Sequence, residues 1–492
     1  MSMRHQQSPK SPRRNTSRAR AHCGAARCLH PPVHIAKPPH NTSRTRLPLV
    51  LLLATLFFPP SLQAQTTTPA PLPEPTGDYN LPVDMNQVHF YLLTVDAGDN
   101  IWDNFGHTAL RVFDENSNID IVFNWGVFDT SGGLLTFSRD FFIGNMDYRL
   151  NISPPEQEFN LYRNQQRTVW QDKLNLNNPQ KVRLYRRLMW NTQPENIPYT
   201  YQYFTDNCTT RPRDYLDESL GGTLSDYYAH TTELSYRDEI RRHYAPNPLI
   251  GFSLDILMNS NIDRHMSEWE SMFRPLKLRT TLLTTQSDII EAGEYLPLLS
   301  DTQIIMQFPS RPPAMNPYQL AAILLLTPII YLFWMLTRPS ASALNTRPGI
   351  TLKYPRLNFR LLGLLGLLTA TFSGTYGTLM LSGWFLSTHL DLHQNINLLL
   401  FWPSDLIGLA IALYWLLTHK PWPMTHNTRP FINYYLFAHL LGIIAYSIIS
   451  LADLTQQTTL PIALYIVPGF LLYTLLIWLV GFTQSRPKHL FI

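Results

Sequence analysis

One cysteine and one histidine, far apart in the chain, are the residue types needed for a thiol nucleophile and its base. Cys208 lies in the polar segment YFTDNCTT (203–210), and His107 begins an apolar segment about a hundred residues upstream. The thiolate is the nucleophilic form of cysteine, and an imidazole can take up the thiol proton. The other cysteines, Cys23 and Cys28, precede an apparent signal sequence. Cys208 is therefore expected to have no disulfide partner in an exported compartment, and the pair predicts nucleophilic catalysis.

The residues around Cys208 predict a helix that begins at the nucleophile. Residues 205–207 (TDN) are helix-capping types, and the glycines at 221–222 are typical of a helix end. We therefore expect a helix over 208–220. Its dipole would favour the thiolate, and a backbone N–H in its first turn would stabilise an oxyanion.

Strand-like segments surround His107. Three segments share the apolar, β-branched and aromatic composition of strands and are separated by turn residues. They span Val88–Asp96, His107–Phe113 and Ile119–Trp125. A third polar group usually orients a catalytic histidine. Asn124, on the strand that follows that of His107, is the candidate for this role, and Asp129 is the alternative.

A helix is also expected to begin at Asn178, with that residue as the N-cap and Pro179 at the first helical position. Its apolar residues recur at helical spacing and are expected in the core. They are Val182, Tyr185, Leu188 and Met189. Its basic residues are expected to form a solvated face rather than a clamp for lipid headgroups. They are Lys181, Arg183, Arg186 and Arg187.

Simpler interpretations exist for both catalytic candidates. Cys208 alone is compatible with a buried, inert thiol, although its neighbours are polar. His107 alone is compatible with a core histidine bonded to a backbone carbonyl. The pair favours catalysis more strongly than either residue does.

The positive charge of the chain is concentrated at its start. The whole sequence has 39 Lys and Arg against 35 Asp and Glu, but residues 1–46 hold ten of the basic residues and no acidic one. The rest of the chain therefore has a net charge of −6, and no nucleic-acid partner is expected. Residues 47–58 are an apolar core that is short for a membrane span, and the small residues at 61–64 resemble a cleavage site.

The composition predicts an exported α+β domain followed by an all-α membrane domain. We expect a basic leader and signal sequence at 1–64, a Pro/Thr-rich linker at 65–87, the periplasmic domain at 88–310, the membrane domain at 318–481 and a cytoplasmic tail at 482–492. Five apolar segments in the membrane domain have about the length of a spanning helix. They cover 318–336, 361–384, 397–417, 431–452 and 461–481.

Loop charges orient these spans. The loops 337–360 and 418–430 and the tail contain Lys and Arg, whereas 385–396 and 453–460 contain neither. The positive-inside rule then places the basic loops in the cytoplasm. An odd number of spans puts the 88–310 domain on the opposite side, which agrees with the leader. The prediction is a multi-pass protein of the bacterial inner (cytoplasmic) membrane with a periplasmic catalytic domain.

Four ordered motifs resemble a known family. A histidine followed by a cysteine at a helix start is the order of permuted NlpC-type, papain-like thiol enzymes. The motifs resemble the periplasmic domain of Lnb-type lipoprotein N-acyltransferases. They are FGHTALRV (105–112), FNWGVFD (123–129), DNCTTR (206–211) and IDRHMSEWESMF (262–273). STH (387–389) and NINLL (395–399) resemble that family's loop between its second and third spans.

This resemblance implies a reaction and its participants. A phospholipid would donate an acyl chain to Cys208 as a thioester, with His107 as the base. The α-amino group of a diacylglyceryl-cysteine lipoprotein would then accept the chain. The partners implied are a phospholipid donor, a lipoprotein acceptor and membrane lipid, with no cofactor.

Further site residues are expected on the substrate and membrane side of the domain. They are Asn207, His389, Asn395 and Asn397. His389 lies near Asp391 and His393, but their spacing is too loose to favour a metal site, and no metal is expected.

Two other function classes compete with acyl transfer. One is a thiol hydrolase of the same superfamily, either a peptidoglycan endopeptidase or a lipid esterase. A peptidoglycan endopeptidase does not need five membrane spans, and cell-wall-binding repeats are absent from the sequence. The other is a non-catalytic membrane sensor or transporter subunit. The predicted spans of this chain hold almost no charged residues, which argues against transport. Asp405, near the start of a span, is the nearest exception.

Overall fold

Apolar alternation in the sequence produces the strands of an antiparallel sheet in the exported domain. The strands β1 (Val88–Val95), β2 (His107–Asp114) and β3 (Ile119–Val127) coincide within two residues with the predicted ones. The computed structural model describes residues 73–75, 77, 79–128, 133–145, 147–310, 316–337, 355–418 and 429–484. The leader at 1–64 and the alternative orienting residue Asp129 lie outside these ranges.

Seven described strands share one sheet in the order β11-β5-β1-β2-β3-β4-β6, and neighbouring strands are antiparallel. The remaining members are β4 (Asp147–Ser153), β5 (Val169–Leu174), β6 (Pro198–Thr200) and β11 (Leu299–Met306). The register places His107 opposite Val95 and Ala109 opposite Asn124. Since side chains two positions apart share a face, His107 and Asn124 come to the same side of neighbouring strands.

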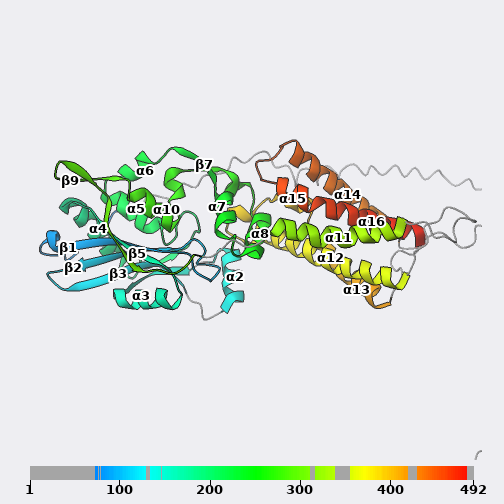
Figure 1. The fold of residues 1–492 in the computed structure, drawn as a ribbon, viewed down its shortest axis with the longest axis horizontal. Coiled ribbons are helices and arrows are strands. Elements are labelled where there is room, and N and C mark those ends of the chain that lie inside the picture. The colour runs from blue at the N-terminus through cyan, green and yellow to red at the C-terminus, as the bar shows by residue number, and fades with distance from the viewer. Residues whose placement is uncertain are drawn as a thin grey trace, which may run out of the picture. The chain divides into compact units, whose positions relative to one another are not determined.

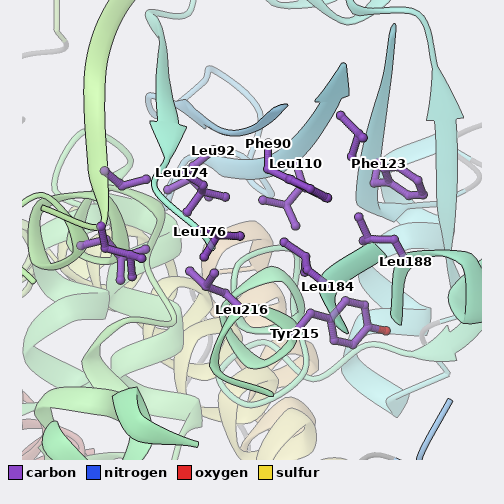
Figure 2. Close-up of a cluster of buried hydrophobic side chains, with 14 of the residues drawn as sticks. Phe90, Leu92, Leu110, Phe123, Leu174, Leu176, Leu184, Leu188, Tyr215 and Leu216 are labelled. Carbon is purple, nitrogen blue, oxygen red and sulfur yellow. The ribbon is translucent and has the colours of Figure 1, made fainter. Parts of the chain in front are cut away.

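Helices cover both faces of the sheet. On one face, Phe90, Leu110 and Phe123 of the strands pack with Leu184 and Leu188 in a buried cluster (Figure 2). Burying one such side chain fully contributes about 1.5–3 kcal/mol. On the other face, Leu93, Ala109 and Val122 pack against Phe159. Asn124 lies on this second face, among apolar residues.

The helices of the exported domain lie between its strands along the chain (Figure 1). They are α2 (Gly133–Ile143), α3 (Pro155–Asn164), α4 (Asn178–Asn191), α5 (Thr210–Ser219), α6 (Thr223–Tyr227), α7 (Tyr236–His243), α8 (Pro248–Leu257), α9 (Glu268–Ser271) and α10 (Pro275–Leu282). Two small two-stranded antiparallel sheets complete the described part of the domain. They are β7 (Thr231–Ser235) with β8 (His265–Ser267), and β9 (Gln286–Glu291) with β10 (Glu294–Pro297).

The structure corrects two expectations about α4. Its N-cap is Asn177 rather than Asn178, because the Asn177 side chain and Gln180 form a reciprocal capping box. Its basic residues are not all solvated. Arg187 is 1% exposed, because its guanidinium pairs with Glu218 at 2.5 and 2.6 Å and donates to the carbonyl of Pro73 at 2.8 Å. Sequence spacing alone could not reveal those partners.

The second half of the chain is helical. Its main helices are α11 (Pro317–Thr337), α12 (Pro355–Leu386), α13 (Ile407–Thr418), α14 (Arg429–Leu451), α15 (Leu460–Tyr465) and α16 (Val467–Gln484). Short 3-10 turns at Leu390–Leu392, Ile396–Leu399 and Pro403–Leu406 connect α12 to α13. The chain is therefore an α+β domain followed by an all-α part, as the sequence predicts.

The number of membrane spans stays a prediction. By length and composition, two described segments are able to cross a membrane, Arg360–Leu386 and Phe431–Leu451. A third is added if the bent pair Leu390–Leu399 and Pro403–Thr418, with an angle of 66°, forms one span. The predicted spans at 318–336 and 461–481 fall on α11 and on α15 with α16.

The acidic residue inside the helical half has partners. The carboxylate of Asp405 accepts hydrogen bonds from the phenol of Tyr435 at 2.6 Å, from the imidazole of His439 at 2.9 Å and from Ser373. A polar group within a membrane domain is stable when neighbouring helices satisfy it in this way.

Candidate active site

Asn207 shapes the turn that carries the cysteine. Its side-chain oxygen accepts the backbone N–H groups of Thr209 and Thr210 at 2.7 and 2.8 Å. Its amide nitrogen donates to the carbonyls of Tyr203 and Phe273 at 2.9 and 3.2 Å. Asn207 is thus buried and fully engaged as a cap. It holds Cys208 one residue before Thr209, the N-cap of α5, whereas the sequence predicts a helix that begins at Cys208 itself.

The backbone N–H groups expected to stabilise an oxyanion at the start of α5 already donate to another acceptor. The N–H groups of Thr209 and Thr210 are both bonded to Asn207. Among the residues that the structure describes, the backbone N–H of Cys208 itself has no hydrogen-bond partner. It is the donor next to the sulfur that remains for a developing oxyanion.

His107 is oriented by Asn124. The distance from Nε2 of His107 to Oδ1 of Asn124 is 2.7 Å. The amide nitrogen of Asn124 donates to Glu158 at 2.8 Å, and Glu158 also accepts from Ser153 at 2.6 Å. Because the Asn124 amide must point its nitrogen at the carboxylate, its oxygen faces the imidazole and accepts the proton on Nε2. Nδ1 is then the ring nitrogen left for the thiol of Cys208.

The thiol and the imidazole change each other's pKa. Burial alone raises the pKa of the Cys208 thiol, but the His107 charge and hydrogen bonds from His107, Thr209 and the Thr108 backbone bring it below its ordinary value. Burial alone lowers the pKa of His107, but the Cys208 thiolate and the bond to Asn124 raise it above its ordinary value. Both shifts favour a thiolate–imidazolium pair, which is the reactive form of a cysteine nucleophile.

The pair remains accessible. Cys208 and His107 are both partly exposed, whereas Asn124 is 5% exposed. Gly126 lies directly beside the sulfur-bearing residue: a Cβ built there would be 3.2 Å from Cβ of Cys208. Its φ of +87° suits glycine. The register of β3 and β4 is irregular between Asn124 and Val127, so Gly126 lies where the strand bends past Cys208.

Tyrosines surround the thiol on its other side. The rings of Tyr148 and Tyr201 stack with centroids 4.4 Å apart, and Tyr148 also contacts Phe128 at 4.8 Å. Burial and then the nearby Cys208 thiolate raise the pKa of Tyr148 and of Tyr201. Both phenols therefore stay neutral and offer an aromatic, uncharged wall to a substrate.

The predicted membrane-side residues lie apart from the triad in the loop between α12 and α13. Asn395 donates to the carbonyls of Ile256 and Leu257 at 2.8 and 2.9 Å, and Asn397 donates to that of Ile256 at 2.9 Å. Both asparagines are buried. They fasten the loop to the end of α8.

His389 lies in the same loop, against aromatic rings. Its imidazole is 4.9 Å from the ring of Tyr203 and 5.9 Å from that of Phe141. Burial lowers its pKa more than Asp391 and a backbone bond to Phe141 raise it. Its Nε2 is buried and has no hydrogen-bond partner among the described residues.

Several site residues were missed from the sequence. Glu158 and Ser153 complete the line of hydrogen bonds behind Asn124, and Thr108 bonds to Thr209 at 3.1 Å. No sequence motif marks these residues, because the line crosses from β3 to α3 only in the folded chain. Within the described ranges, no group of three His, Cys, Asp or Glu is placed to hold a metal ion.

One family model matches the part of the chain that contains this site. Residues 77–238, which include His107, Asn124 and Cys208, match the family model of the Lnb N-terminal periplasmic domain. No curated protein and no solved structure matches the chain, so the permuted NlpC-like fold stays a prediction. The domain's name and the apolar helices fit a membrane protein with a periplasmic domain. The resemblance to Lnb-type proteins that the sequence motifs indicate is confirmed by this match over residues 77–238.

Proposed function

We propose that this protein is a multi-pass thiol acyltransferase of the bacterial inner membrane that moves an acyl chain from a phospholipid to the α-amino group of diacylglyceryl-cysteine lipoproteins. The observation that carries the proposal is the hydrogen-bonded series of Cys208, His107 and Asn124, in a domain of the Lnb family. A nucleophile, a base and an orienting group in that order are the requirements for covalent catalysis.

In the first half-reaction, the Cys208 thiolate attacks the carbonyl carbon of a phospholipid ester. The new carbon–sulfur bond gives a tetrahedral oxyanion, which the N–H of Cys208 stabilises. When the carbon–oxygen bond to glycerol breaks, the His107 imidazolium gives its proton to the leaving oxygen. The products are a lysophospholipid and a thioester on Cys208.

In the second half-reaction, the free amine of the lipoprotein attacks the thioester carbonyl. His107, now neutral, takes a proton from the amine, and the carbon–sulfur bond breaks to return the thiolate. The product is an amide that carries the transferred chain. Asn124 keeps the imidazole in one tautomer and one orientation throughout both halves.

The attachment of the catalytic domain to apolar helices supports membrane-bound substrates. Tyr203, which precedes the turn of Cys208, donates to Asp391 of the helical half at 2.7 Å. Both the lipid ester and the lipoprotein are anchored in a bilayer. Holding the thiol at that surface raises its encounter with them above what free diffusion gives.

The test uses purified full-length protein and its Cys208→Ala variant in liposomes. The liposomes contain phospholipid and a diacylglyceryl-cysteine peptide with a free amine, and mass spectrometry reads the peptide. We expect a mass gain of one acyl chain on the amine with the wild type and none with the variant.

Three other outcomes would change the assignment. Lysophospholipid and free fatty acid without acylated peptide would indicate a lipid esterase. Cleavage of a peptidoglycan stem peptide, with intact lipid, would indicate an endopeptidase. An unchanged peptide and unchanged lipid with folded protein would favour a non-catalytic sensor or transporter subunit.

A further inference from the structure

A cavity whose lining does not include the thiol site has residues of both the exported domain and the helical half in its wall. Its volume is about 450 Å3. Its lining residues come from α7, α8 and the turn between them, from the start of α11 and from both ends of α15. Its lining includes Arg241, Tyr244, Phe252, Asn316 and Tyr465.

Arg241 is held so that one edge of its guanidinium is committed and the other is not. Its Nε and Nη2 donate to the same oxygen of Asp255 at 3.1 and 3.0 Å. Within the described part of the chain, Nη1 has no hydrogen-bond partner, and the side chain is 35% exposed. An arginine fixed on one edge by a carboxylate is pre-organised to bind an anion with the other.

A row of charged side chains holds the carboxylate of Asp255, and through it the guanidinium of Arg241, in place. Asp263, Arg237, Asp255 and Arg241 form a row of alternating sign, with contacts of 2.6, 2.8 and 3.0 Å. Burial raises the pKa of Asp255, but Arg237 and Arg241 bring it below its ordinary value, so it stays charged. Arg241, at the end of this row, and its partner Asp255 both line the cavity.

Further hydrogen-bond donors face the same space. The side-chain amide nitrogen of Asn316 and the phenol of Tyr465 have no partner among the described residues, and both residues line the cavity. Between these donors lie apolar groups, including Pro248 and Phe252. The carboxylate of Asp255 also lines the cavity, but its oxygens accept hydrogen bonds from Arg237, Arg241 and Tyr318. The groups left for a ligand are one edge of a cation, two neutral donors and an apolar floor, which suit an anionic head and an apolar body.

The place of the cavity in the chain indicates which amphiphile it takes. Asn316 directly precedes α11, and Tyr465 ends α15, so the cavity lies at the ends of apolar helices. The predicted topology puts these ends on the periplasmic side of the bilayer. Lipid headgroups lie at this depth, with their chains directed into the membrane.

We propose that this cavity binds the phosphate diester of a glycerophospholipid headgroup through Arg241, Asn316 and Tyr465. This inference rests on the proposed function in one respect: it assigns the bound lipid as the acyl donor. Tyr244, on the cavity wall, donates to the carbonyl of Ile101 at 3.1 Å and lies 5.9 Å from the ring of Phe105, two residues before His107. The headgroup site therefore adjoins the loop that leads to the catalytic base.

The test compares Arg241→Gln with Arg242→Gln in the full-length protein. Arg242 is adjacent, 65% exposed and outside the cavity lining, so it controls for the loss of one charge. Native mass spectrometry in detergent measures binding of dioleoylphosphatidylglycerol, of dioleoylglycerol and of inorganic phosphate. All binding assays use the Cys208→Ala background so that no lipid is consumed.

We expect Arg241→Gln to weaken phosphatidylglycerol binding about 10- to 100-fold, the size of one lost charge-assisted hydrogen bond. Arg242→Gln should leave it unchanged, and dioleoylglycerol should not compete. In the active background, Arg241→Gln should raise the KM for donor lipid by a similar factor with kcat preserved. Tyr465→Phe, which keeps the ring, should weaken binding less.

The outcomes separate this inference from the proposed function. Equal binding by Arg241→Gln and Arg242→Gln, with acyl transfer intact, would overturn the headgroup site and leave the function standing. Inorganic phosphate that binds as tightly as the lipid would overturn the lipid assignment. Arg241-dependent lipid binding without any acyl transfer by the wild type would support the site and reject its role as donor site.

Discussion

Tyr203 and Asp391 join the nucleophile's turn to the helical half of the chain. The phenol of Tyr203 donates to Asp391 at 2.7 Å, and the carbonyl of Tyr203 accepts from Asn207 at 2.9 Å. The same residue is therefore bonded to the cap that holds Cys208 and to the loop that follows α12. The position of the thiol depends on the loop between two apolar helices, as well as on the sheet.

We expect Tyr203→Phe to lower kcat/KM for acyl transfer about tenfold, because a hydrogen bond to a carboxylate is lost while the ring stays. Alkylation of Cys208 by a small soluble reagent should not change. Tyr227→Phe, at a tyrosine that is 74% exposed, is the control. Loss of alkylation in Tyr203→Phe would show that the bond supports the thiol itself rather than its docking.

The thiolate–imidazolium pair predicts an unusual pH profile for Cys208. The lowered pKa of the thiol means that alkylation by iodoacetamide should rise with pH at a midpoint below about 8.5, the value of free cysteine. In His107→Ala, burial of the thiol is no longer opposed by the imidazolium, so the midpoint should move up. A wild-type midpoint at or above that of free cysteine would contradict the activated nucleophile.

The raised pKa of His107 sets the highest pH at which the first half-reaction proceeds at its full rate. The imidazolium must be present to protonate the leaving oxygen, so thioester formation should fall as pH rises through the His107 pKa, which lies above about 6.5. His107→Ala should lower kcat by about 10²–10⁴-fold at neutral pH. Single-turnover release of lysophospholipid measures this step, and a pH-independent rate would count against the role of His107.

The hydrogen bonds from Asn124 to His107 and to Glu158 predict that substitutions at Asn124 and at Glu158 reduce activity to different degrees. Asn124→Ala should lower kcat about 10²-fold, because the imidazole loses its fixed orientation. Glu158→Gln should have a smaller effect, because the substituted amide can still bond to Asn124 but no longer dictates how that side chain is turned. Melting temperatures of both proteins serve as the folding control. Equal activity in Asn124→Ala and wild type would remove Asn124 from the site.

Gly126 predicts a steric effect on the nucleophile. In Gly126→Ala the new methyl group would press on Cβ of Cys208 at 3.2 Å, and the φ of +87° adds backbone strain. Gly293→Ala has nearly the same strain, with a φ of +89°, but meets no atom within 4 Å. We expect acyl transfer to fall at least tenfold in the first variant only. A similar fall in both would assign the effect to backbone strain.

The buried guanidinium of Arg237 predicts a large effect on stability. It is 1% exposed and bonds to Asp255 and Asp263 at 2.8 and 2.6 Å. Arg237→Met would leave both carboxylates without this partner, at a cost of about 3–5 kcal/mol. Arg242→Met, at an exposed site, should cost less than about 1 kcal/mol. Chemical denaturation of the two variants measures the difference.

The three candidate catalytic residues could be predicted from the sequence because only one cysteine follows the apparent signal sequence and the local patterns around it and His107 are strong. Cys208 and His107 follow from one exported thiol and one histidine at a strand start. Asn124 follows from strand order, since directly opposite residues of adjacent antiparallel strands place their side chains on one face. Asn124 lies opposite Ala109, two residues after His107. The structure brings these three residues together, and their catalytic roles stay a proposal.

Other parts of the site depended on contacts that no local pattern encodes. Asn207 was expected near the substrate, but the fold engages its side chain in capping the turn. Arg187 was expected in solvent because helical spacing shows only which face a residue occupies. Its burial depends on Glu218 and on Pro73, far away in the sequence. Such pairings arise from tertiary packing, which overrides local propensity.

The position of β11 in the sheet has a consequence for biosynthesis. β11 is the last strand of the exported domain in sequence and forms one edge of the seven-stranded sheet, where it pairs with β5. Ten residues separate its end from α11. A domain whose final strand arrives so late has high contact order and exposes an unpaired edge until then. Until β11 has been synthesised, β5 presents its unpaired backbone at that edge of the sheet. The sheet is therefore complete only shortly before α11 begins in the sequence.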